Sequence, residues 1–290
     1  MAGAGVREYK RRIRSVKNTQ QITKAMEMVA AARLRRAQEK AEASRPYNET
    51  LQGTMARLSA IALDVKNPLL EKRDDIKKIG YIVITADRGL CGAYNSNIIR
   101  MANTSMDEHD KSIEKVIIAV GRKARDFYRK RGSLAAEYIN LGDHIAYTDA
   151  REVAQYVIEA YENEELDEVY LVYAKFASIL RQVPTVTKVF PLEPPKREED
   201  ETQTIDYIYE PSAEGVLISL LPRYVGSLIY NSMLEGKASE FGARMAAMGN
   251  ATKNAGEIID NLTLIMNKAR QAAITDEILD IVGCAEALKS

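Results

Sequence analysis

The stretch FGARMAAMGNATKNAGEIIDNLTLIMNKARQAA, from Phe241 to Ala273, decides the architecture of this chain. Its mostly apolar positions recur at alternating steps of four and three residues, the spacing of a coiled-coil seam. This spacing predicts a helix with one narrow apolar stripe that a second helix covers. The seam positions are Phe241, Met245, Met248, Thr252, Ala255, Ile259, Leu262, Met266, Ala269 and Ala273.

Proline-free stretches at both ends of the chain extend this prediction. No proline precedes Pro46 and none follows Pro222. We expect one helix over 1–62 and another over 212–290, each bent near its proline. A continuous 79-residue helix would be about 120 Å long, too long for one globular domain, so the two helices should pair antiparallel as a rod. The N-terminal stripe is predicted at Val6, Tyr9, Ile13, Val16, Ile22, Ala25 and Val29.

Three glycines recur every seven residues in the C-terminal helix: Gly242, Gly249 and Gly256. Each costs about 1 kcal/mol relative to alanine inside a helix. Their shared face predicts that a partner backbone approaches closely there, although tolerance of flexible positions would produce the same pattern.

The middle segment, 63–211, alternates strand-like and helix-like patterns. Continuous apolar strands separated by amphipathic helices are typical of a mainly parallel, Rossmann-like α/β domain covered on both faces. Asp149 is a plausible N-cap of the last helix. Strands are predicted at Ile79–Ala86, Lys115–Val120, Leu134–Asn140, Glu168–Phe176 and Thr185–Phe190, and helices at Gly92–Asp107, Gly121–Arg131 and Asp149–Glu164.

The charge of the chain is unevenly distributed. The 290 residues carry 41 basic and 41 acidic side chains, but residues 1–60 alone hold 13 basic and 5 acidic ones. Such a basic helix meets an acidic protein loop, a membrane surface or a phosphate backbone, or is simply solvated. A nucleic-acid adaptor is disfavoured because only Tyr9 and Tyr47 could stack on bases there. The longest apolar run, Val169–Ala174, is far too short to span a membrane.

One loop could hold chemistry. Asp87–Ala93 (DRGLCGA) follows the first predicted strand, where α/β domains place phosphate loops, but it lacks both the GxGxxG and the Walker patterns. Cys91 has no neighbouring histidine and is expected to be a buried small hydrophobe. Two cysteines and two histidines form no metal-ligand spacing. We therefore expect no catalytic residue, cofactor or metal, and keep as an alternative an α/β enzyme with this ligand loop and helical oligomerisation arms.

Three motifs resemble the gamma subunits of F-type ATP synthases. They are ITKAMEMVAA (Ile22–Ala31), TADRGLCGAYN (Thr85–Asn95) and the run from Ala243 to Val282 that contains NKARQAAITDEILDIV. The resemblance covers essentially the whole chain in the right order, although Cys284 replaces a usual glycine. It implies a non-catalytic central rotor shaft that couples rotation of the membrane rotor ring to the catalytic beta subunits, for ATP synthesis or hydrolysis.

The resemblance also implies partners and contact residues. The coiled coil would stand inside a ring of alpha and beta subunits, while the central domain would bind epsilon and the rotor c-ring at the cytoplasmic face of the cell membrane, with no nucleic acid bound. The beta-subunit lever would meet Lys24 and Met26, and more loosely Arg33, Arg35 and Arg36. Loops of the ring would meet Arg244, Arg270, Gln271 and Thr275, and the foot partners would meet Tyr207 and Glu210.

Overall fold

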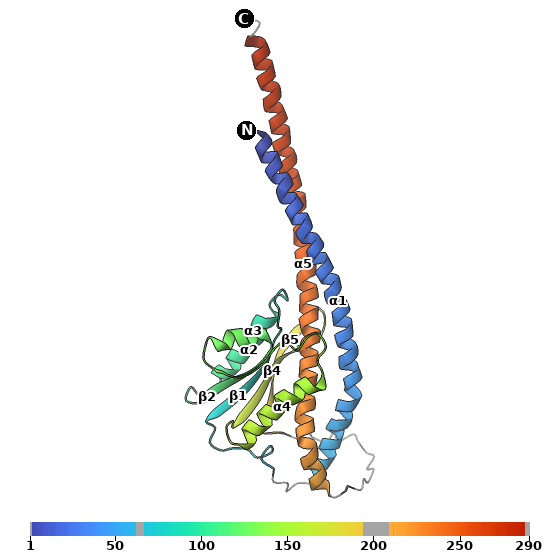
Figure 1. Cartoon of the computed structure of the whole chain (residues 1–290), viewed down its shortest axis with the longest axis vertical. Helices are drawn as coiled ribbons and strands as arrows, with labels where there is room; N and C mark the ends of the chain where they lie inside the picture. The colour runs from blue at the N-terminus through green and yellow to red at the C-terminus, as the bar shows by residue number, and fades with distance from the viewer. Residues whose placement is uncertain (1, 62–66, 194–208, 211, 288–290) are drawn as a thin grey trace. The chain divides into compact units, whose positions relative to one another are not determined.

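The structure, a computed structural model, describes residues 2–61, 67–193, 209, 210 and 212–287. Their contacts divide the chain into two compact units. Unit 1 joins Met1–Val29 to Met245–Ser290, and unit 2 comprises Ala30–Arg244. Helices α1 (Ala2–Ile61) and α5 (Ala213–Ala287) each contribute to both units (Figure 1).

The two long helices confirm that each end of the chain is helical, whereas the bends expected at the two prolines stay predictions. Helix α1 has 60 residues and α5 has 75, and each runs without interruption through its proline, Pro46 or Pro222. A proline removes one backbone hydrogen bond, but the many bonds on either side preserve a long helix. The predicted segment boundaries at 62/63 and 211/212 fall beside or on residues outside the described ranges, so the division into three segments stays a prediction.

Unit 2 contains a five-stranded sheet with the order β3-β2-β1-β4-β5. Three of its neighbouring pairs are parallel, and only β4 and β5 run antiparallel. The mainly parallel α/β fold predicted from the sequence is therefore confirmed. The strands are β1 (Lys78–Ile84), β2 (Glu114–Val120), β3 (Leu134–Tyr138), β4 (Glu168–Phe176) and β5 (Gln182–Phe190).

Both faces of the central strands β2, β1 and β4 are buried, as continuous apolar strands require, whereas the edge strand β3 alternates half-buried and exposed residues. Figure 1 shows α4 (Tyr147–Glu162) on one side of the sheet, and α2 (Tyr94–Asp107) and α3 (Arg122–Arg129) on the other. Alternate residues of β1 enter the two cores: Ile82 packs in the core with α4 and α5, and Tyr81 in the core with α2 and α3. The α5 segment of unit 2 thus forms part of the sheet's covering layer.

Two local details position the loops at the carboxyl ends of the strands. Asp149 is not the N-cap of α4. It lies three residues inside, and its carboxylate accepts a hydrogen bond from the N-cap backbone of Ala146 at 2.8 Å. Gly121, with φ of +101°, joins β2 to α3, and a Cβ there would lie 2.2 Å from the carbonyl oxygen of Thr85. Only glycine fits this crossing of two backbones.

Candidate functional site

Helices α1 and α5 pair antiparallel with one constant register in each unit. In unit 1 the Thr252 hydroxyl lies 2.8 Å from that of Thr23, and in unit 2 the Ser44 hydroxyl donates to Asn231 at 3.2 Å. Along α1 the residue numbers rise as those of their α5 partners fall. The numbers of facing residues add to 275 or 276 for Gln20–Gly256, Thr23–Thr252, Glu27–Gly249 and Ser44–Asn231.

The seam predicted for α5 is confirmed by burial. Phe241, Met248, Ala255 and Ala273 are buried, the other six predicted seam positions are half-buried, and none of the ten is exposed. Steps of four and three residues keep these side chains on one stripe of the helix.

The stripe predicted for α1 is wrong after Val16. Ile22 and Val29 are 60% and 51% exposed, and Ala25 is exposed as well. The helix instead turns polar side chains toward α5, and these half-buried residues continue the four-three steps from Val16 to the buried Ala30: Gln20, Thr23 and Glu27. Continuing the four-three steps from Val16, instead of selecting apolar residues, would have identified Gln20, Thr23 and Glu27 from the sequence.

The heptad glycines of α5 make room for side chains, which corrects the expectation of a close backbone. The Cβ position of Gly249 is 3.6 Å from the carboxyl carbon of Glu27, and that of Gly256 is 3.2 Å from the Gln20 amide nitrogen. Gly242 lies instead against the β4–β5 connection, 3.2 Å from the Phe176 ring. In unit 1 the glycines therefore accommodate the polar side chains that α1 places in the seam.

The C-terminal end of α5 is uncovered in unit 1. The register places Ala2, the first residue of α1, opposite residues 273 and 274, and every described side chain from 274 to 285 is exposed. Figure 1 shows α5 continuing past the start of α1. Its exposed apolar side chains are Ile274, Ile278, Leu279, Ile281 and Val282, which are 49–69% exposed. Apolar surface of this kind marks a binding surface.

The unit 1 residues expected to meet partners lie at the surface. The side chain of Lys24 is 56% exposed and forms an ion pair with Glu27 at 3.2 Å, while Met26 is half-buried. Arg270, Gln271 and Thr275 are all exposed near the uncovered end of α5.

The residues expected to bind the foot partners are described only in part. Glu210 is exposed, and Tyr207 lies outside the described residues.

The three arginines of α1 that were expected to meet the beta-subunit lever differ in their contacts. Arg33 forms an ion pair with Asp143 at 2.8 Å and Arg35 forms one with Glu39 at 3.0 Å, whereas Arg36 borders a cavity.

Arg244 belongs to a buried charged cluster in unit 2. Its side chain is 12% exposed and forms an ion pair with Glu240 at 2.7 Å, while Glu240 also accepts from Lys237 at 3.1 Å. The second Arg244 nitrogen reaches the carbonyl oxygen of Gly89 at 3.4 Å. The spacing of Lys237, Glu240 and Arg244 on a helix could have revealed this cluster from the sequence.

The Asp87–Ala93 loop is a tight structural turn in the described structure. Asp87 accepts from the backbone N–H of Arg122 at 2.9 Å, and Leu90 and Gly92 have positive φ. Cys91 is 1% exposed, as predicted, and burial raises the pKa of its thiol, which opposes the thiolate a nucleophile needs. The cavity beside the loop measures about 20 Å³, room for a water but not for a substrate. The enzyme alternative has no supporting site there.

The described residues contain neither a candidate metal site nor a candidate membrane span. No cluster of three metal-ligating side chains occurs within the described ranges. No helix among them is long and apolar enough to cross a membrane.

Comparison with known proteins gives whole-chain matches. A family model described as ATP synthase matches residues 5–288. The ATP synthase gamma chain of Desulfitobacterium hafniense is 54% identical over 99% of this chain and 100% of its own length, and that of Pelotomaculum thermopropionicum is 53% identical over 98% and 99%. In fold, the chain is similar to one chain of the Euglena gracilis mitochondrial ATP synthase, with a TM-score of 0.68, 21% identity, and coverage of 99% of this chain and 95% of that one.

Proposed function

The chain belongs to the family of ATP synthase gamma chains, non-catalytic subunits of the central stalk, and we propose that its paired terminal helices are the shaft that turns inside a ring of alpha and beta subunits. Residues 63–211 would form the foot that binds epsilon and the membrane rotor c-ring. The chain would thus sit peripherally on the cytoplasmic face of the cell membrane and couple proton transport to ATP synthesis or hydrolysis.

The observation that carries this proposal is the match over the whole chain to gamma chains at 54% identity. The helix pair adds physical support, since a single antiparallel register is kept in both units and leaves one end of α5 bare and apolar. An exposed apolar surface of this kind is expected where another protein covers it.

Such a shaft works by contacting identical sites differently. A contact changes the nucleotide affinity of a site only if its free energy differs between that site's conformations. An asymmetric rod touches three chemically identical catalytic sites with three different surfaces, so its rotation exchanges binding free energy among them. The shaft therefore needs no catalytic group of its own.

The exposed residues supply two contact surfaces in unit 1. On α1, Ile22, Met26 and Val29 follow steps of four and three residues and so share one helix face, which would meet the beta-subunit lever, while Lys24 would meet the lever from another side of the helix. On α5, the polar residues at the base of the uncovered end would donate to loops of the ring: Arg270, Gln271 and Thr275. The foot partners would meet Tyr207 and Glu210.

Arg244 has a different task in this proposal. Glu240 and the carbonyl oxygen of Gly89 already bind the Arg244 guanidinium. Arg244 would therefore hold the Asp87–Ala93 loop in place for contact with the ring, instead of contacting the ring itself.

Assembly with separately purified alpha and beta subunits tests the proposal. We expect the full-length chain to co-elute with them in one complex, and ATP turnover to require the beta subunit. The chain alone is expected to hydrolyse no ATP, because its loop cavity of about 20 Å³ cannot hold the nucleotide. Robust turnover by the purified chain, or failure to join the complex, would refute the shaft.

The exposed apolar surface of α1 gives a second expected result. Replacing both Ile22 and Val29 by serine should leave the helix intact, since the two side chains are more than half exposed. We expect gradient-driven ATP synthesis in vesicles to fall at least tenfold, because tenfold corresponds to about 1.4 kcal/mol and each apolar side chain buried against a partner contributes about 1.5–3 kcal/mol. Leu180→Ser is the matched control, since Leu180 is 86% exposed on the β4–β5 turn. Equal rates for the two variants would exclude this surface.

A further inference from the structure

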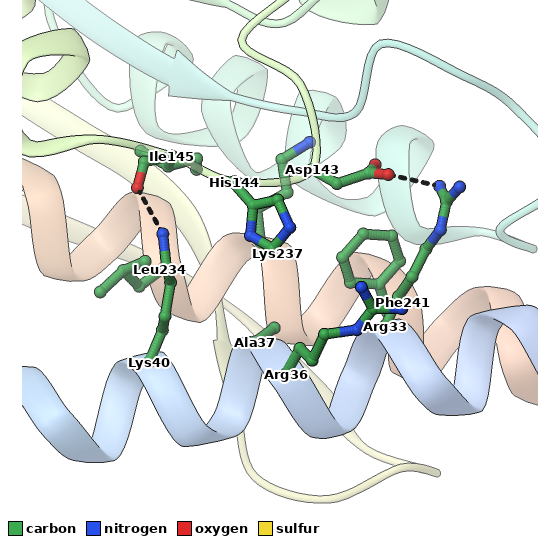
Figure 2. Close-up of a pocket in the computed structure, with 10 residues that line it drawn as sticks. All are labelled: Arg33, Arg36, Ala37, Lys40, Asp143, His144, Ile145, Leu234, Lys237 and Phe241. Carbon is green, nitrogen blue, oxygen red and sulfur yellow. Dashed lines mark hydrogen bonds and ion pairs between the residues drawn. The ribbon is translucent and has the colours of Figure 1, made fainter.

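A cationic cavity lies in unit 2 between α1, α5 and the loop that precedes α4. Its volume is about 110 Å³. Figure 2 shows side chains from all three elements converging on it, with His144 of the loop at its centre. Four of its lining side chains are permanently cationic and one is a carboxylate, namely Arg33, Arg36, Lys40 and Lys237 against Asp143.

Half of these cations have no carboxylate partner. Arg33 is neutralised by Asp143 at 2.8 Å and Lys237 by Glu240 at 3.1 Å. Arg36 donates only to the carbonyl of Ala32, at 3.4 Å, and Lys40 only to the carbonyl of Ile145, at 3.2 Å. Within the described ranges, no acidic side chain forms an ion pair with either of them. The cavity thus holds uncompensated positive charge.

The floor of the cavity strengthens this charge. It is formed by buried apolar side chains, with Ala37, Leu234 and Phe241 only 9%, 3% and 1% exposed. A low-dielectric floor excludes water from one side of a bound ion and increases its attraction to the surrounding cations. Arg36 and Lys40 lie at the exposed rim of this floor, and an ion bound against the floor would be attracted to them more strongly than an ion on an open helix face.

The size of the cavity limits the ligand. A cavity must have a volume of about 10–15 Å³ to hold one water molecule, whereas cavities that bind drug-sized ligands measure about 300–1,000 Å³. A cavity of about 110 Å³ accepts a compact group with several oxygen atoms but not a whole nucleotide. The guanidinium fork of Arg36 suits tetrahedral oxyanions, to which arginine donates two parallel hydrogen bonds.

We propose that this cavity is a binding site for a phosphoryl group, held by Arg36 and Lys40 with His144 beside it. The ligand is either inorganic phosphate or the terminal phosphate of a nucleotide whose remainder stays outside the cavity. This inference goes beyond the proposed shaft function, because it gives the non-catalytic chain a small-molecule ligand of its own. The anion concentration would then change the stability of the packing between α1, α5 and the loop that precedes α4.

The two histidines of the chain provide a site-specific readout. His144 lines the cavity, whereas His109 packs against Tyr81 and Tyr170, with distances between ring centroids of 6.5 and 5.4 Å. Inorganic phosphate is titrated into the full-length chain at fixed pH and ionic strength, and the imidazole resonances are followed by NMR. We expect a saturable shift of the His144 signals and none of the His109 signals. No saturable His144 shift with either phosphate or ADP would overturn the proposal.

Neutral substitutions separate this site from the general positive charge of α1. We expect Arg36→Gln and Lys40→Gln each to weaken phosphate binding about tenfold, the loss typical of a charged hydrogen bond. Both side chains are exposed, so melting temperatures should stay unchanged. Arg35→Gln is the matched control, since Arg35 is 84% exposed and pairs with Glu39. An equal loss in Arg35→Gln would reveal non-specific attraction and overturn the proposal.

Parallel titrations identify the source of the phosphoryl group. Tighter saturable binding of phosphate than of ADP supports the free anion, and the reverse order supports the nucleotide, provided that Arg36→Gln weakens the tighter ligand. Binding of a glutamate-rich peptide without binding of either phosphate or ADP would show a protein-docking surface instead and would refute the site.

Discussion

A chain that ends at Arg244 is expected to lose gradient-driven ATP synthesis completely. The deletion removes the α5 half of unit 1 and leaves every residue of unit 2 in place. Residues 2–29 of α1 would then lack the seam that covers Tyr9, Ile13 and Val16, and would lose the packing that supplies most of a helix's stability in a protein. No shaft would then reach the catalytic sites. The measurement is ATP synthesis by the reconstituted complex in vesicles under an imposed ion gradient.

A second deletion serves as the control. A chain that ends at Ala273 loses only the uncovered end of α5 and keeps every seam position. Hydrogen exchange should show residues 2–29 protected in this variant and unprotected in the one that ends at Arg244. If the Arg244 variant synthesised ATP at the wild-type rate, unit 1 would not be the coupling element and the proposed function would fail.

The sequence was sufficient to predict what depends on periodicity. The four-three steps of α5 predicted every seam position from Phe241 to Ala273, because such steps keep side chains on one narrow stripe of a helix. The strands were predicted because runs buried on both faces must be apolar throughout. Glu168–Phe176 was predicted with its observed bounds.

The same reasoning failed where two surfaces compete for apolar residues. Ile22 and Val29 were assigned to the seam of α1 because they are apolar, but they are exposed. The seam holds Gln20 and Thr23, whose polar groups bond across to α5 at Thr252. A hydrophobic pattern cannot distinguish the apolar residues of an internal seam from those of an exposed surface.

Contacts between elements that are distant in the chain could not be predicted from the sequence either. The cavity unites Arg36 of α1 and Lys237 of α5 with His144, which are distant in sequence, and no spacing rule connects them. The resemblance to gamma subunits placed Arg244 toward the ring, yet the structure shows its guanidinium bound within unit 2. The resemblance identified Arg244 as a contact residue, but the bonds that its guanidinium already makes determine which further acceptors it can reach.

That internal bond predicts the largest stability effect in unit 2. Glu240 is 5% exposed and forms ion pairs with both Lys237, at 3.1 Å, and Arg244, at 2.7 Å, so its single negative charge is shared between two cations. Glu240→Gln keeps the volume but leaves two buried cations facing a neutral amide. We expect the free energy of unfolding to fall by about 3–5 kcal/mol, the cost of breaking a buried ion pair by removing one partner. Urea unfolding of the full-length chain measures this change.

Two further variants make the interpretation specific to burial. Glu8→Gln removes the same kind of carboxylate from the exposed i,i+4 pair with Arg12 and should lower the free energy of unfolding by less than about 1 kcal/mol. Adding Lys237→Met to Glu240→Gln removes one of the two stranded cations and should restore part of the lost stability. If Glu240→Gln were no more damaging than Glu8→Gln, the cluster would not hold Arg244. Its guanidinium would then be free for the surrounding ring, as the family resemblance implied.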